Sequence, residues 1–524
     1  MKALPVGVQS FADLRKKDYL YVDKTKEVHQ LITSGKIYFL SRPRRFGKSL
    51  LASTLEELFK GNKPLFEGLY IYDKYDWTRQ YPVLMIDWSN IKHSSAEAIE
   101  IDTCRFLAGI AASYQITLLS EYASGKFAEL IERLYEKTGC QVVVLVDEYD
   151  MPILDALENT AELAPMRAFL QEFYRVLKGV DKYLQFVFLT GVSKFAKVSL
   201  FSGMNSPDDI TMDETYAAIC GYTQEELEAC FADYIHEFAC KMKVTDKIII
   251  ESVRRWYNGY SWDGVTTVYN PFSTLLLFRK KVFSNHWFST GSATFLVNQI
   301  KKRNDAELLL EPVQVSADGF DNFELDAIST KLLLFQTGYL TVKSASRAED
   351  EEELEYTLGI PNEEVRKSLI QHVVSSYTEC PVSDTGDFRN RMRRQLSDGD
   401  VSGFQRNMRA QFARIPYQLH IPCDAYYHSL ILLWLNMLGF EALGEVPTSI
   451  GRIDAVWKWK DRIVIAEIKH DEKSAPEALV QEAFDQIHKR RYYDGFAGSN
   501  RRIALMAIAI AGRDIECRME EWET

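Results

Sequence analysis

Four apolar runs separated by helical segments constrain the fold of this chain more than any other feature. Longer stretches with helical spacing, such as 122–137 and 160–178, lie between them. A strand that is apolar on both faces belongs in a buried parallel sheet, and helices between such strands form the crossovers. The sequence therefore predicts an α/β domain with a parallel sheet over residues 1–214. The runs are KIYFL (36–40), YPVLMID (81–87), VVVLVD (142–147) and LQFVFLT (184–190).

Three further segments follow this domain, as expected for a chain of 524 residues. Residues 215–345 have a mainly helical pattern, in which Thr223 is a predicted N-cap with Glu226 at the capping-box position. The acidic stretch RAEDEEELE (347–355) predicts a solvent-exposed joint at the start of a linking segment, 346–419. From 420 to 524 a dense apolar helix precedes short strands, which predicts a small third α/β domain.

Charge and apolar content exclude several classes of protein. The net charge of −12 argues against a protein that coats nucleic acid through one broad basic face. RNRMRRQ (389–395) and KRR (489–491) remain as local basic patches or as solvated helix faces. No apolar run approaches the roughly 18 residues of a membrane span, and the N-terminus lacks an apolar signal core. We therefore expect a cytoplasmic protein with no membrane partner.

A phosphate-binding loop is predicted at RPRRFGKS, residues 42–49. Backbone N–H groups of such a loop wrap phosphates, its lysine reaches the β and γ oxygens, and its serine holds Mg²⁺. Arg42 occupies the position of the usual first glycine, which weakens the pattern but leaves the helix N-terminus and the lysine in place. Two interpretations stay open for Arg44 and Arg45, because they either add charge near the phosphates or face solvent. The predicted nucleotide contacts are Arg44, Arg45, Phe46, Gly47, Lys48 and Ser49.

Polar residues end two other predicted strands. VVVLVDEYD ends in Asp147, which can bind Mg²⁺ together with Ser49, and in Glu148, which can orient and deprotonate the attacking water. Thr190 and Ser193 follow the strand at 184–190. They are predicted γ-phosphate contacts if that strand neighbours the strand of the phosphate loop.

Several motifs in order resemble the AAA-ATPase-like family of bacterial P-loop proteins. In that family RPRRFGKS is the usual form of the Walker A loop, so the resemblance implies that ATP binding, with Mg²⁺, survives Arg42. ATPases of this kind close the site with a helical domain, which implies a lid over residues 215–345. The alternative is that the aromatic residues of YNGY and YNPFS form the core of their own domain. The motifs are LPVGVQSF, YVDKTKEV, RPRRFGKSL, VVLVDEYD, LTGVSKFAKVSLFSGMN, YNGY and YNPFS.

Two carboxylates and a lysine are predicted to converge near the C-terminus. Glu467 and Lys469 are two residues apart on one predicted strand and so share a face, and a turn near 459–461 would bring Asp454 beside them. The carboxylates can bind Mg²⁺ and the ammonium can position a nucleophile or neutralise charge on a phosphate. The alternative is a structural salt bridge of Lys469.

This arrangement resembles the PD-(D/E)XK nuclease superfamily, with EIK (467–469) as its E-x-K. The resemblance implies Asp454 as the middle acid, with Glu445 assisting and Asp424 as the acid of the first helix. Gln486 matches the glutamine of the helix after the core, and Tyr492 follows at the family's spacing.

The leading hypothesis is an ATP-hydrolysing protein coupled to a Mg²⁺-dependent nuclease domain that acts on DNA or RNA. One alternative is an ATP-driven switch whose C-terminal domain binds without cleaving, and another is remodelling of proteins. Residues 421–524 carry thirteen Lys and Arg against seventeen Asp and Glu, an unusual balance for a domain that grips DNA unaided. The sequence leaves the oligomeric state open, including a homo-oligomer.

Overall fold

The computed structural model groups the chain into two compact units, Met1–Gly291 with Val313–Glu364, and Ser292–Pro312 with Val365–Thr524. The four segments predicted from the sequence remain a prediction, and their boundary at 345 falls within strand β7 (Thr341–Arg347). The structure describes residues 1–156, 159–194, 207–287, 296–297, 299–300, 303, 305–309, 312–320, 329–347, 354–378, 382–413, 424–440, 442–499, 501–512 and 514–522. Most of the acidic stretch 347–355 lies outside these ranges, as do residues 195–205 of the motif LTGVSKFAKVSLFSGMN.

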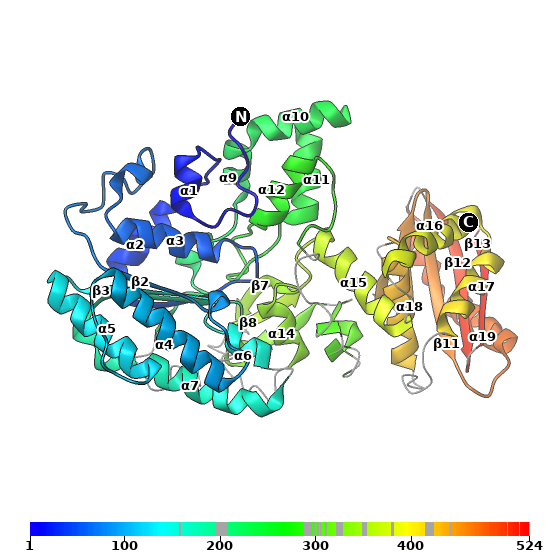
Figure 1. The fold of residues 1–524 in the computed structure, drawn as a ribbon. Coiled ribbons are helices and arrows are strands. Elements are labelled where there is room, and N and C mark those ends of the chain that lie inside the picture. Colours follow the sequence, from blue (N-terminus) through cyan, green and yellow to red (C-terminus); the bar gives the residue numbers. More distant parts are fainter. Residues whose placement is uncertain are drawn as a thin grey trace. The chain divides into compact units, whose positions relative to one another are not determined.

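A five-stranded parallel sheet forms the centre of the first unit, as the apolar runs predict (Figure 1). Its order is β2-β3-β4-β1-β5, so β4 pairs with β1 along its length. The condition attached to Thr190 and Ser193 is therefore met, because their strand neighbours that of the phosphate loop. The strands are β1 (Ile37–Ser41), β2 (Val83–Asp87), β3 (Val142–Asp147), β4 (Leu184–Gly191) and β5 (Asp208–Asp209).

Helices cover the sheet because its strands are apolar on both faces. Alternate residues of the strands, such as Val144 and Val146, pack in one buried cluster with α4 (Ala96–Ser113), α5 (Ala123–Thr138) and α7 (Thr160–Gly179). Helix α3 (Lys48–Phe59) also packs against β3. The remaining helices of this part are α1 (Phe11–Lys16), α2 (Thr25–Ser34) and α6 (Met151–Ala156).

The segment after the sheet is mainly helical, as predicted, and adds a small antiparallel sheet of order β6-β8-β7. The capping box of Thr223 and Glu226 is present and begins α9. Its elements are α9 (Gln224–Cys230), α10 (Ala232–Met242), α11 (Asp246–Tyr257), α12 (Pro271–Lys280), β6 (Val313–Ser316), α14 (Thr330–Gln336), β7 and β8 (Leu354–Gly359).

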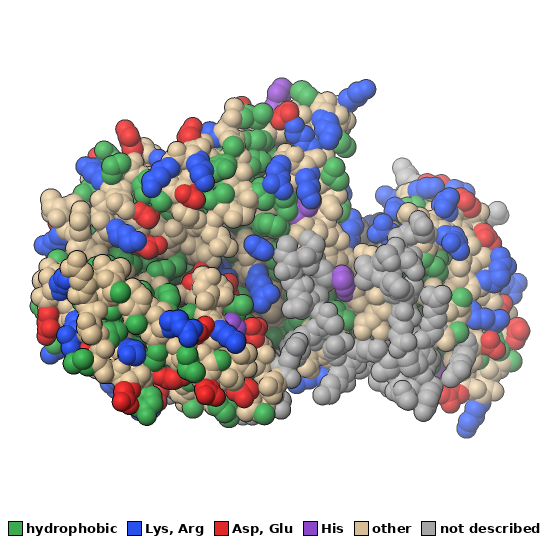
Figure 2. All heavy atoms as spheres, viewed as in Figure 1, with side chains coloured by type: hydrophobic (Ala, Val, Ile, Leu, Met, Phe, Trp, Pro, Cys, Tyr) green, Lys and Arg blue, Asp and Glu red, His purple; other side chains and the backbone are tan. Residues whose placement is uncertain are grey.

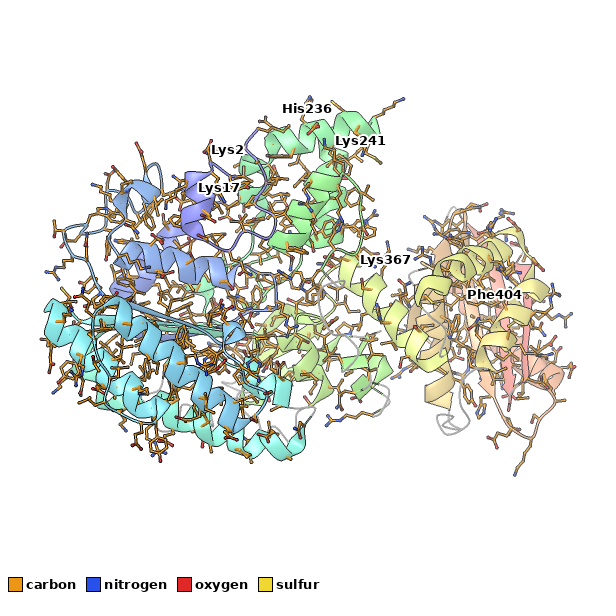
Figure 3. The ribbon with its side chains drawn as sticks, viewed as in Figure 1. Lys2, Lys17, His236, Lys241, Lys367 and Phe404 are labelled. Carbon is orange, nitrogen blue, oxygen red and sulfur yellow. The ribbon has the colours of Figure 1, made fainter. Side chains whose placement is uncertain are left out.

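The second unit contains a five-stranded mixed sheet of order β13-β12-β11-β10-β9. Helix α19 (Pro476–Arg490) packs on β11 and β12, and α17 (Val401–Phe412) packs on β13 with Phe404 buried (Figure 3). The turn predicted at 459–461 joins β10 to β11. The other elements are α15 (Glu363–Thr378), α16 (Val382–Asp398), α18 (Asp424–Met437), β9 (Leu443–Thr448), β10 (Gly451–Trp459), β11 (Arg462–His470), β12 (Arg502–Ala511) and β13 (Asp514–Trp522).

Within the described ranges, no helix combines the length and the apolar character needed to cross a membrane.

Candidate functional site

The predicted phosphate loop lies between β1 and the N-terminus of α3. Gly47 is the N-cap of α3 and has a φ of 96°, a left-handed conformation that glycine adopts without strain. A helix N-terminus presents unpaired N–H groups and the positive end of the helix dipole. The loop therefore has the strand, turn and helix order that phosphate binding requires.

Lys48, Ser49 and Asp147 lie together at this loop. The Lys48 side chain is almost buried, and its Nζ donates to the carbonyl oxygens of Arg42, at 3.0 Å, and Pro43, at 3.3 Å. Burial raises the pKa of Asp147 to about 6, although the positive charge of Lys48 and a hydrogen bond from Ser49 oppose that rise. A loop cation and a hydroxyl–carboxylate pair thus meet at the end of the sheet.

Glu148 follows Asp147 in a left-handed backbone conformation with a φ of 54°. Such a conformation is uncommon for a residue other than glycine, and it tends to persist where the surroundings or the function demand it. The Glu148 side chain is half-buried, and its N–H donates to Asp147 Oδ1 at 3.1 Å.

The hydroxyl groups of Thr190 and Ser193 have partners within the protein. Thr190 Oγ1 donates to the carbonyl of Leu40 at 2.9 Å, and Ser193 Oγ donates to Asp150 Oδ2 at 2.6 Å. Asp150 is buried and also accepts the N–H of Ser193 at 2.7 Å, so it fixes the segment after β4. A nucleotide contact by either hydroxyl remains a prediction.

Arg42 is a structural anchor in place of the usual glycine. Its fully buried guanidinium donates to the carbonyls of Ser41 and Thr211, each at 2.9 Å, and of Tyr216, at 3.3 Å. Its Cζ also lies 3.8 Å from the centre of the Trp262 ring. Burial lowers the pKa of Arg42 to about 10, which leaves it charged at neutral pH. The side chain ties the loop to two distant segments, one that contains Thr211 and Tyr216 and one that contains Trp262.

Aromatic residues between 258 and 287 pack on the same loop. Phe46 is buried with its ring 4.8 Å from Tyr260 and 5.5 Å from Trp262. Trp287 Nε1 donates to the carbonyl of Arg44 at 3.0 Å. The segment predicted as a lid therefore contacts the phosphate loop through its aromatic turns.

The two loop arginines for which the sequence left alternatives open are both exposed. The Cζ of Arg45 lies 5.0 Å from the ring centre of Phe272 in YNPFS. Their charge is thus available at the loop surface.

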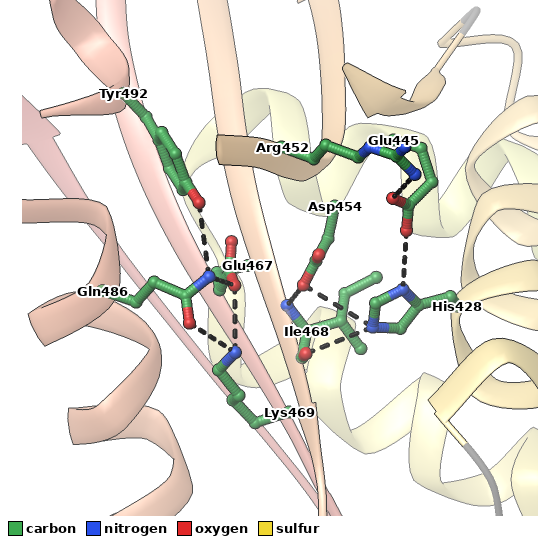
Figure 4. A network of polar contacts seen from close by, with 9 residues as sticks. All are labelled: His428, Glu445, Arg452, Asp454, Glu467, Ile468, Lys469, Gln486 and Tyr492. Carbon is green, nitrogen blue, oxygen red and sulfur yellow. Dashed lines mark hydrogen bonds and ion pairs between the residues drawn. The ribbon is translucent and has the colours of Figure 1, made fainter. Parts of the chain in front are cut away.

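The second constellation lies on β10 and β11 and the helices beside them (Figure 4). Lys469 Nζ lies 3.0 Å from Glu467 Oε1 and 2.8 Å from Gln486 Oε1. Gln486 Nε2 donates to Glu467 Oε1, and it also lies 3.3 Å from the hydroxyl of Tyr492. Asp454 Oδ2 accepts the N–H of Ile468 at 2.7 Å. The fold brings together the residues expected from the sequence.

Burial shapes the charge of this constellation. Burial and the nearby charge of Asp454 raise the pKa of Glu467 to about 7. Burial alone would lower the pKa of Lys469, but the carboxylate of Glu467 raises it above its ordinary value. Glu467 Oε2 is buried and accepts no hydrogen bond from the described residues. A buried carboxylate oxygen of this kind is a ligand that a divalent cation would satisfy.

His428 of α18 is a residue that the sequence reasoning missed. Its Nε2 lies 3.5 Å from Asp454 Oδ2, and its Nδ1 lies 3.6 Å from Glu445 Oε1. One ligand atom from each of these three residues lies within 4.8 Å of the others, a grouping that could hold a metal ion. The signal was present in YYH (426–428), one helical turn after Asp424. Asp424 begins α18, but its side chain lies outside the described residues.

Comparisons with known proteins give matches for the region of the phosphate loop and for the region of the carboxylate constellation. A family model described as "Predicted AAA-ATPase" matches residues 5–201, and the model of the PD-(D/E)XK nuclease superfamily matches residues 423–522. A protein of Azotobacter chroococcum mcd 1, described as "Uncharacterized protein in vnfD 5'region", is 38% identical over 516 residues. The alignment covers 97% of this chain and 96% of that protein.

Proposed function

This chain belongs to the AAA-ATPase-like family and carries a C-terminal domain of the PD-(D/E)XK nuclease superfamily, and from that premise we propose that it hydrolyses ATP and cleaves nucleic acid with Mg²⁺. The observation that carries the proposal is the convergence of Asp454, Glu467 and Lys469 in a chain that also has the phosphate-loop residues Gly47, Lys48 and Ser49 at the start of α3.

ATP is the proposed substrate of the first site. Lys48 already lies at the loop with Nζ on two of its carbonyls, so it can exchange these contacts for phosphate oxygens. Ser49 and Asp147 would hold Mg²⁺, which neutralises charge on the phosphates when bound. Glu148 would orient the attacking water, and its backbone conformation supports a functional role.

Residues of the second site fit a divalent cation. Asp454 and Glu467 would hold it, with His428 and Glu445 close enough to contribute. When bound, Mg²⁺ stabilises negative charge on a scissile phosphate. Lys469 is held by Glu467 and Gln486 in a partly buried position, from which its ammonium can contact a phosphate or a nucleophilic water. Gln486 fixes both Lys469 and Glu467, which makes it a positioning residue.

Two observations favour the ATP-driven switch with a non-cleaving C-terminal domain. Lys469 already forms an ion pair with Glu467, as a purely structural lysine would, and residues 421–524 are net acidic. The two functions differ in whether labelled strands are cut.

The test is cleavage of labelled DNA and RNA, single-stranded and duplex, in Mg²⁺ or Mn²⁺ with and without ATP. We expect metal-dependent cleavage by the wild type, and its loss in Asp454→Ala and Lys469→Ala while ATP turnover stays intact. Absence of cleavage by the wild type on every substrate would favour the switch.

A further inference from the structure

A basic surface pocket lies between α16 and the turn that joins β10 to β11. Its volume is about 460 Å³. The turn contributes Trp459 and Lys460, and the helix contributes Asn390, Arg393, Arg394, Ser397 and Asp398. The two arginines belong to RNRMRRQ, one of the two basic runs that neither candidate site uses. Figure 2 shows Lys and Arg side chains gathered over the part of this unit that carries α16.

Trp459 organises the pocket. The Cζ of Arg393 lies 4.3 Å from the centre of its ring, and Lys460 Nζ lies 5.8 Å from the same centre. The indole Nε1 donates to Ser397 Oγ at 2.8 Å, and the ring meets Phe440 edge-on at 5.0 Å. Cation–π contact and hydrogen bonding thus fix α16 to the turn. The indole is already engaged, so the pocket offers charged donors rather than a free surface for stacking a base.

The basic side chains that line this pocket outnumber the acidic ones. Among the described residues, Arg393, Arg394 and Lys460 form no ion pair, and Asp398 is the single acid that lines the pocket. Burial and the like charge of Arg389 lower the pKa of Arg393. Residues 389–397 hold four arginines and no acidic residue. Like charges held this close repel one another, and a bound anion relieves that repulsion.

Residues 421–524 have a net negative charge, so the basic charge of α16 is the more important for holding a nucleic-acid strand. That segment carries thirteen basic against seventeen acidic residues, so its own surface does not supply the charge that holds a nucleic-acid strand. Helix α16 lies outside that segment but in the same compact unit. Guanidinium and ammonium groups are good donors to the phosphates of a nucleic-acid backbone. Because no aromatic surface is free to stack on a base, we expect binding that does not depend on the base sequence.

We propose that this pocket binds backbone phosphate of the nucleic-acid strand on which the carboxylate site acts, independently of base sequence. The inference rests on the proposed nuclease function, since it names how that substrate is held. Trp459 is five residues beyond Asp454 along β10, a separation of about 16 Å. One strand of a duplex places about five phosphates in that length. Residues an odd number apart on a β-strand point to opposite faces, so a nucleic-acid strand that contacts both places must pass around the sheet and must be longer than about five nucleotides. The oligonucleotides of about 30 nucleotides in the test below exceed that length.

The test is binding of the full chain to labelled oligonucleotides of about 30 nucleotides, single-stranded and duplex and of several sequences, measured by fluorescence anisotropy over a range of salt. EDTA is present throughout, so that binding is read without cleavage. The pocket variant is Arg394→Gln with Lys460→Gln, and both side chains are exposed. The matched control is Arg406→Gln with Arg518→Gln, which removes two exposed cations from the same unit outside the pocket.

We expect the pocket variant to bind every sequence about tenfold more weakly than the wild type. The slope of log affinity against log salt concentration should also fall by about one to two, as expected for the loss of one to two phosphate contacts. The control variant should stay within about twofold of the wild type. Equal affinity of the two variants, or no binding by the wild type, would overturn the proposal.

Two further outcomes separate this inference from the proposed nuclease function. If the pocket variant loses binding but the wild type cuts nothing in Mg²⁺, the pocket stands and the nuclease fails. If the wild type cuts and the pocket variant binds and cuts equally well, the nuclease stands and the pocket fails. A third outcome concerns a small ligand. If inorganic phosphate at constant ionic strength raises the melting temperature of the wild type but not of the pocket variant, and oligonucleotides bind the two proteins equally, the ligand is a small phosphate and the strand proposal is wrong.

Discussion

The phosphate loop and the carboxylate constellation both suit phosphate chemistry, but they differ in where the positive charge comes from. The loop has its own cation in Lys48, the N-terminus of α3 and two exposed arginines. In the second constellation Lys469 is paired with Glu467, and a buried carboxylate oxygen accepts no hydrogen bond from the described residues. The comparison teaches that the first site has its own positive groups for a phosphate, whereas we expect the second to need a bound cation before an anion can approach.

Lys48→Ala tests the first half of this comparison and has the largest expected effect. Loss of the one compact cation aimed at the phosphates should reduce ATP hydrolysis by about 100-fold or more. Turnover is measured by phosphate release, and nucleotide affinity by titration. Lys60→Ala, just beyond the other end of α3, is the control because Lys60 forms an ion pair with Glu56 of that helix. Unchanged turnover in Lys48→Ala would remove the loop from the mechanism.

Metal removal separates the two sites. With EDTA, we expect strand cleavage to disappear, because no cation is then left at Asp454 and Glu467 to stabilise charge on the phosphate. Nucleotide binding should persist with reduced affinity, because Lys48 and the helix N-terminus remain. Titration of nucleotide and a cleavage assay on the same sample provide the measurement. Cleavage that continues in EDTA contradicts the comparison.

Arg42→Gly restores the usual glycine of the loop and yet should harm the protein. It removes the guanidinium hydrogen bonds to the carbonyls of Ser41, Thr211 and Tyr216 and the contact with Trp262. We expect a loss of about 2 to 4 kcal/mol in unfolding free energy and about tenfold weaker nucleotide binding. Denaturant unfolding and nucleotide titration measure these effects.

Arg44→Gly is the matched control for this change, because Arg44 is exposed. It should leave stability close to that of the wild type. If Arg42→Gly instead tightened nucleotide binding without loss of stability, the hydrogen bonds of Arg42 would not be needed to hold the loop in place.

Glu364 should cause the smallest effect, a pH dependence of stability in the first unit. Its carboxyl is buried and accepts the N–H of Trp287 at 2.8 Å, and burial raises its pKa to about 7. The folded state therefore keeps the proton up to about pH 7, whereas the unfolded chain releases it near pH 4.5. Its contribution is complete at low pH and is lost as the pH rises through 7, by at most about 3 kcal/mol.

The measurement compares thermal unfolding at pH 6 and pH 8. Glu364→Gln should lose less stability than the wild type over this interval, whereas Glu363→Gln, a half-buried neighbour with the same change in charge, should behave like the wild type. Equal losses in all three proteins would show that Glu364 is not the titrating group.

The central sheet and the β10–β11 hairpin could be predicted because their signals are local. Continuous apolar runs mark strands buried on both faces, and the two-residue spacing of Glu467 and Lys469 fixes their common face. Thr223 and Glu226 similarly predicted a helix start from four residues.

The roles of Arg42 and His428 could not be predicted because their partners are distant in the sequence. Arg42 meets carbonyls at 211 and 216 and the ring of Trp262, which only the folded chain brings to the loop. His428 reaches Asp454 because α18 packs on β11. The sequence YYH places this histidine one helical turn after Asp424, but it does not show which strand the helix packs on.

The most direct measurement is cleavage of an end-labelled strand by the wild type and by Glu467→Gln, in Mn²⁺ and in Mg²⁺, with ATP hydrolysis followed in the same reactions. Gln can still accept a hydrogen bond from Lys469 but lacks the charge that holds a cation. The account predicts cleavage by the wild type, none by Glu467→Gln, and equal ATP hydrolysis by both. Equal cleavage by the two proteins, or none by the wild type, would contradict it.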